Sequence, residues 1–177
     1  MNRQILVAGL GLIVAACASR PPFPTVAVPQ NLQPAPNEVA LMAVAARGVQ
    51  IYECRVKKDD PNATEWAFVA PEADLFDAQG KPVGKHYAGP HWESTDGSKV
   101  VGSAKARADA PQAGAIPWLL LTTKSDGGSG AFANVTSVQR VNTVGGVAPA
   151  ADGCTSASLG KGARVAYTAD YLMFGAK

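Results

Sequence analysis

The sequence contains no apolar run long enough to cross a membrane as a helix. Its longest apolar stretch covers residues 5–16 and is 12 residues long, whereas a bilayer requires roughly 20. We therefore expect no transmembrane helix. A short apolar stretch that follows a basic residue, here Arg3, is typical of a secretory signal peptide. The alternative is a buried N-terminal helix, which the lack of any polar face disfavours.

Excess charge of one sign is also missing. The net charge is +2, and no basic run is longer than Lys57-Lys58. Nucleic-acid binding depends on clustered positive charge, so we expect no nucleic-acid partner. The 177 residues are 47% hydrophobic, which is enough to fill the core of a single globular domain.

Familiar catalytic motifs are absent as well. The chain has no Gly-x-Ser-x-Gly elbow, no His-Glu-x-x-His pair and no phosphate-binding loop with a lysine. It has only two histidines, and its carboxylates are dispersed. These absences favour a protein that is not an enzyme, without a cofactor or a metal site.

The apolar stretch ends in Val14-Ala15-Ala16-Cys17, which resembles the lipobox of bacterial lipoproteins. The resemblance implies that residues 1–16 are a signal peptide and that Cys17 is lipidated and holds the protein to a membrane. Because Ala18 and not aspartate follows, it also implies the outer membrane, with the domain in the periplasm or at the cell surface. The alternative is an ordinary cleavage site beside a stray cysteine.

Residues 17–36 are predicted to form the lipidated cysteine and a proline-rich tether, and residues 37–177 the globular domain. Six prolines fall within the 19 residues 18–36, a density that favours extended polyproline conformation. Such a tether spans up to roughly 60 Å at about 3.1 Å per residue. The alternative is a remnant with no spacer role.

Short alternating segments separated by turns dominate the rest of the chain. Strands are predicted at residues 49–56, 66–70, 116–123, 135–141 and 165–174, after one short N-terminal helix at residues 38–46 that Asn37 caps. This pattern predicts a mainly β fold, a single antiparallel β-sandwich or barrel-like domain with one short helix.

Two cysteines remain if Cys17 is lipidated. An exported compartment permits disulfides, and an even count there favours a bridge, so we expect Cys54 and Cys154 to be joined. The alternatives are a buried free thiol at Cys54 and a thiol nucleophile, which would lack a neighbouring histidine.

Residues 84–98 hold both histidines of the chain together with aromatic and acidic side chains. We predict that His86, Tyr87, Trp92 and Glu93 border a shallow ligand-binding cleft, because an aromatic face beside polar groups binds sugars or peptides without catalysis. The alternative is that Tyr87 and Trp92 fill the core and the histidines satisfy backbone groups. The spacing fits no established zinc pattern.

Arg140 is the other candidate binding residue. It lies at the polar end of a predicted strand and is expected either to pair with an anionic ligand or to form an ion pair with Asp170 or Glu93. The sequence favours the second interpretation, a structural ion pair.

Several phrases of the sequence, taken in order, resemble domain of unknown function 3455 (DUF3455) over roughly residues 38–175. They are Gly-Val-Gln-Ile-Tyr-Glu-Cys at 48–54, Pro-Glu-Ala-x-Leu at 71–75, His-Tyr-x-Gly-Pro-x-Trp-Glu at 86–93, Pro-Trp-Leu-Leu-Leu at 117–121, Val-Gln-Arg-Val-Asn-Thr-x-Gly-Gly at 138–146 and Tyr-x-Ala-Asp-Tyr at 167–171. The resemblance implies a secreted or envelope setting and implies no activity.

The sequence thus favours a cell-envelope lipoprotein whose domain is a non-catalytic binding or structural module, with the membrane as its partner through the lipid anchor. Two alternatives stay open, a hydrolase of cell-wall glycan or peptide and a metal or redox accessory protein. An enzyme would need a cleft holding an ionisable group with a shifted pKa.

Overall fold

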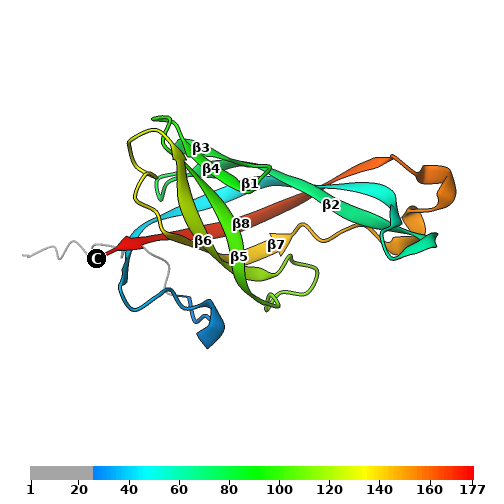
Figure 1. Cartoon of the computed structure of the whole chain (residues 1–177), viewed down its shortest axis with the longest axis horizontal. Helices are drawn as coiled ribbons and strands as arrows, with labels where there is room; N and C mark the ends of the chain where they lie inside the picture. The colour runs from blue at the N-terminus through cyan, green and yellow to red at the C-terminus, as the bar shows by residue number, and fades with distance from the viewer. Residues whose placement is uncertain (1–25) are drawn as a thin grey trace, which may run out of the picture.

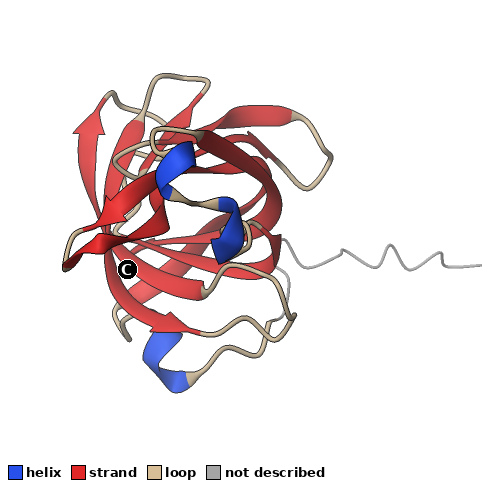
Figure 2. Ribbon diagram, turned by 90° about the vertical axis from the view of Figure 1, so that its right-hand side faces the viewer, coloured by secondary structure: helices blue, strands red, loops and turns tan. Residues whose placement is uncertain are grey.

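The structure is a computed structural model, and it describes residues 26–177. The predicted signal peptide, Cys17 and the first part of the tether lie outside the described residues. Eight antiparallel strands form one closed barrel in which every strand pairs with its sequence neighbours and β1 pairs with β8 (Figures 1 and 2). The prediction of a mainly β fold of sandwich or barrel type is therefore confirmed as a barrel.

The bounds of the strands and of three short 3₁₀ turns are as follows. They are η1 (Gln30–Leu32), β1 (Glu38–Lys57), β2 (Asp60–Phe76), β3 (Pro82–Tyr87), β4 (His91–Ser94), β5 (Lys99–Ala108), β6 (Trp118–Gly127), β7 (Ser137–Gly145), η2 (Ala151–Gly153), η3 (Ser156–Ser158) and β8 (Gly162–Ala176). In Figure 1, β1, β2 and β8 reach well beyond the barrel on the right, where the turn segment before β8 covers them.

The predicted helix at residues 38–46 is wrong. These residues form the first half of β1, in which Val44 pairs with Tyr171 of β8 and Ala45 pairs with Phe76 of β2. Val44 and Ala46 are buried while Ala45 between them is not, which is the period of a strand. Pairing with β2 and with β8, which is more than a hundred residues away in sequence, therefore overrides the local helix signal.

The inside of the barrel holds the main apolar core. Fully buried side chains from opposite walls meet there, among them Leu75, Trp92, Val100, Val138 and Tyr171. Because successive side chains of a strand point to opposite faces, the neighbours of these residues face outward.

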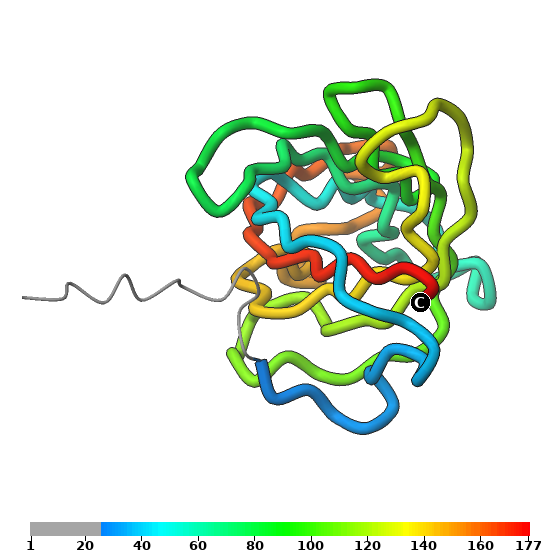
Figure 3. The backbone as a smooth tube through the Cα atoms, turned by 90° about the vertical axis from the view of Figure 1, so that its left-hand side faces the viewer, coloured from blue at the N-terminus to red at the C-terminus, as the bar shows by residue number. Residues whose placement is uncertain are grey.

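A second apolar cluster lies on the outside of the barrel. Outward side chains of β6, β7 and β8, including Trp118, Leu120 and Leu172, pack around Leu32 of η1. The Gln139 amide donates a hydrogen bond of 2.6 Å to the Leu32 carbonyl oxygen. The segment 26–36, drawn in blue, thus lies against the outer wall of the barrel (Figure 3).

A disulfide joins Cys54 of β1 to Cys154, which follows η2. The predicted bridge is therefore confirmed, and both cysteines are buried. It fixes the turn segment before β8 to the extended part of β1. No helix among the described residues is long and apolar enough to cross a membrane.

Candidate functional site

The four residues predicted to border a cleft lie on one hairpin, formed by β3 and β4. Within it His86 pairs with Trp92, and Lys85 pairs with Glu93. Paired residues of an antiparallel hairpin share one face, and their neighbours share the other. His86 and Trp92 therefore point into the barrel, whereas Tyr87 and Glu93 point outward.

The inward pair is part of an aromatic cluster. The rings of His86 and Trp92 are stacked with their centroids 4.4 Å apart, and Tyr171 meets both rings edge-on at 5.0 and 5.3 Å. Gly102 of β5 leaves room for the indole, because a Cβ atom there would lie 2.7 Å from a Trp92 ring carbon. The alternative that Trp92 fills the core thus matches its position.

His86 is held as a neutral imidazole. Burial lowers its pKa to about 3, more than the hydrogen bond to His91 raises it. His86 Nδ1 lies 2.8 Å from the His91 carbonyl oxygen, which only accepts, so Nδ1 carries the proton. Nε2 is then left as an acceptor inside the barrel.

The outward pair makes its own contacts. The Tyr87 hydroxyl donates a 2.5 Å hydrogen bond to Glu93, which raises the pKa of Tyr87 to about 12. Tyr87 also stacks on His91, whose Nε2 lies 3.1 Å from a carboxylate oxygen of Asp126. The barrel wall therefore separates the Tyr87 and Glu93 side chains from the stacked rings of His86 and Trp92, although His86 and Tyr87 both line a second, smaller hollow beside β1 and β2.

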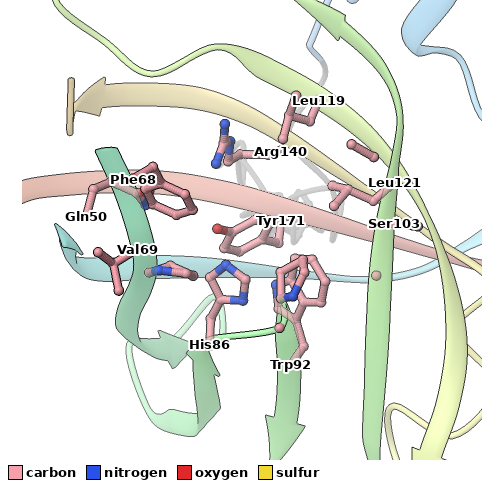
Figure 4. Close-up of a pocket in the computed structure, with 15 residues that line it drawn as sticks. Gln50, Phe68, Val69, His86, Trp92, Ser103, Leu119, Leu121, Arg140 and Tyr171 are labelled. Atoms are coloured by element: carbon pink, nitrogen blue, oxygen red, sulfur yellow. The ribbon is translucent and has the colours of Figure 1, made fainter. Parts of the chain in front are cut away.

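A cavity of about 300 Å³ opens beside the inward pair. All eight strands contribute to its lining, and Phe68 and Val69 of β2 are among its exposed residues. The apolar part of the lining includes Phe68, Val69, Pro71, Pro90, Trp92, Leu119 and Leu121, and the polar part consists of Gln50, His86, Ser103, Arg140 and Tyr171 (Figure 4).

Arg140 is the only charged residue of this lining. Its Nε and Nη2 atoms donate hydrogen bonds of 3.0 and 2.8 Å to the Pro117 carbonyl oxygen. The expected ion pairs are not formed, because Asp170 accepts a hydrogen bond from Asn142 and Glu93 accepts one from Tyr87. Asp170 and Glu93 point outward, because their strand neighbours, Tyr171 and Trp92, point inward. Their carboxylates therefore face away from Arg140.

Two further buried donors belong to residues of the lining. Gln50 Nε2 and Trp92 Nε1 make no hydrogen bond within residues 26–177. Burial raises the pKa of the Tyr167 hydroxyl, and the nearby Gln50 amide lowers that pKa only slightly. The two side chains do not meet with hydrogen-bond geometry. Unsatisfied buried donors are rare in native proteins, and each has a protein, ligand or water partner as a rule.

The sequence identifies the hairpin but not the rest of the lining. Gln50, Leu119, Leu121 and Tyr171 come from β1, β6 and β8, which only barrel closure brings together. On the predicted strand, Gln50 lies on the same face as Tyr52 and Cys54. A polar residue at such a core-facing position was the sequence signal that could have identified Gln50 as part of the lining. No group of three or more metal-ligating side chains is found in the described part of the chain.

Comparison with known proteins gives one result. Residues 34–175 match the family described as "Protein of unknown function (DUF3455)". None of the curated proteins and none of the solved structures matches the chain. The matched region begins just before β1 and ends one residue before the end of β8, so it includes nearly all of the barrel and every residue that lines the cavity. The chain belongs to the DUF3455 family.

Proposed function

We propose that this protein is a non-catalytic binding protein that holds a small molecule inside its barrel. The cavity lined by all eight strands carries the proposal. Small-molecule sites are concave and mostly apolar, with a few polar groups that fix orientation, and barrels of this size enclose single ligands. A volume of about 300 Å³ lies at the lower end of the usual range, so the ligand is small.

The composition of the lining supports binding over hydrolysis. It includes no carboxylate and no thiol, so it offers no paired carboxylates for glycoside cleavage and no cysteine nucleophile. A general base works best with a pKa near the operating pH, whereas the pKa of His86 is about 3. His86 is thus suited to accept a hydrogen bond from a ligand and poorly suited to take its proton.

Blocking the cavity tests this proposal. Two aromatic probes of matched shape, 2-naphthamide and 2-naphthoate, are titrated against the protein by isothermal calorimetry. We expect at least one of them to bind at a single site. Ala104→Phe places a ring beside the cavity at an exposed lining position, and we expect it to abolish that binding.

Thr122→Phe serves as the matched control, because Thr122 is exposed on β6 and does not line the cavity. We expect it to leave binding unchanged. Binding that survives Ala104→Phe, or the failure of both probes to bind the unchanged protein, would contradict a ligand site inside the barrel.

We also propose that the protein is an outer-membrane lipoprotein anchored through Cys17. Residues 26–36 pack on the barrel, which leaves residues 18–25 as the span between anchor and domain, about 25 Å when extended. The barrel would then lie close to the membrane surface.

The intact mass of the mature protein is expected to include acyl chains on Cys17, and an unmodified Cys17 would refute the anchor. Cys17→Ala should release the protein from membranes.

A further inference from the structure

Arg140 presents an uncompensated positive charge to the cavity. It is partly buried on β7, and no carboxylate of residues 26–177 lies within ion-pair distance of its guanidinium. A charge removed from water without a partner is costly. The two hydrogen bonds to Pro117 hold the guanidinium in place and use two of its five N–H groups, and the guanidinium also stabilises the ionised form of the nearby Tyr171 hydroxyl.

The electrostatic effect of Arg140 extends through the inside of the barrel. Its charge lowers the pKa values of His86, Tyr52, Tyr167 and Tyr171. Burial has the larger effect in each case, because it lowers the pKa of His86 and raises the pKa values of the three tyrosines. These residues come from β1, β3 and β8. Arg140 therefore acts as a positive charge on several groups inside the barrel, and none of the cavity-lining side chains carries the opposite charge.

We propose that the ligand is a small carboxylic acid whose carboxylate binds Arg140 while its flat, apolar body packs against Leu119, Leu121 and Tyr171. This inference rests on the proposed function and names the ligand class of the same cavity. A planar guanidinium with free N–H groups matches a carboxylate. Figure 4 shows the Arg140 side chain beside Leu119 and near the Tyr171 ring.

The remaining polar groups favour a carboxylate over a phosphate. No lysine and no second arginine lines the cavity, and His86 is neutral, so one positive charge is available for one negative charge. The unpartnered amide of Gln50 and indole N–H of Trp92 supply additional donors within the lining. Together with the Arg140 guanidinium, these donors fit a group that carries two acceptor oxygens.

The two naphthalene probes test the inference, because they differ only in replacing a carboxylate by a neutral amide. A charge-assisted hydrogen bond contributes roughly 10- to 100-fold in affinity. We expect 2-naphthoate to bind the unchanged protein at least about 10-fold more tightly than 2-naphthamide. This comparison requires no variant, so it holds even if a substitution at Arg140 impairs folding.

Substitutions then assign the effect to one residue. Arg140→Gln is expected to weaken 2-naphthoate binding by at least about 10-fold and to change 2-naphthamide binding by less than about threefold, whereas Arg140→Lys should recover part of the loss. Arg164→Gln is the control, because Arg164 pairs with Glu72 on the outside of the barrel and is absent from the lining. It should alter neither affinity.

The outcomes separate the inference from the proposed function. Equal affinities for acid and amide, or a preference for the amide, would overturn the carboxylate assignment and leave a ligand site inside the barrel intact. An acid preference that Arg140→Gln does not reduce would overturn it equally. Failure of both probes to bind would remove the proposed function together with the inference.

Discussion

Trp92→Ala is expected to lower the free energy of unfolding by about 3–5 kcal/mol. Trp92 is 1% exposed and stacks on His86, with Tyr171 meeting both rings edge-on. Loss of the indole would leave a void next to Gly102 that β5 cannot fill without moving. Urea unfolding followed by far-UV circular dichroism measures the change, since that signal does not depend on tryptophan fluorescence.

Lys85→Ala is the control for Trp92→Ala. Lys85 lies on the same hairpin one residue before His86, is exposed, and forms no ion pair within the described chain. Exposed substitutions of this type usually change stability by less than about 0.5 kcal/mol. Equal effects of the two substitutions would show that Trp92 does not pack inside the barrel.

Removal of the disulfide is expected to destabilise the domain by up to about 4.7 kcal/mol, the loop-entropy value for a closure of this size. The bridge spans a sequence separation of 100, and it connects β1 to the turn segment that precedes β8. The double variant Cys54→Ala/Cys154→Ala tests this in urea unfolding, with alanine chosen because it adds no polar group at the two buried positions.

The single variants provide the control for this double variant. Each of them breaks the same bond, so each should lose nearly as much stability as the double variant, and the losses should not add. Titration of two free thiols in the folded, oxidised protein would contradict the bridge itself.

The sequence predicted strands well where the alternating pattern was local. Residues 49–56 and 165–174 both lie within observed strands, β1 and β8, because alternate side chains of each point into the core of the barrel. The segment 38–46 was predicted as a helix because Asn37 and Glu38 resemble a helix start. Only its pairing with β8 and β2 makes it a strand, and such long-range pairing leaves no local signal.

The candidate site was predictable in part for the same reason. Residues 84–98 stood out by composition, and they do place His86 and Trp92 at the cavity. The inward or outward direction of each side chain depends on hairpin register, which a sequence rich in turn residues does not specify. Arg140 was noted as a possible anion-binding residue, but its lack of a carboxylate partner became visible only once Asp170 and Glu93 were found on outward-facing positions.

The location of a bound probe tests the central claim most directly. Intermolecular nuclear Overhauser effects between 2-naphthoate and isotopically labelled protein report which side chains surround the ligand. We predict contacts with the methyl groups of Leu119 and Leu121 and with the ring of Tyr171, all of which line the cavity. Contacts confined to outward-facing side chains such as Tyr87, or none at all at saturating probe, would contradict a ligand site inside the barrel.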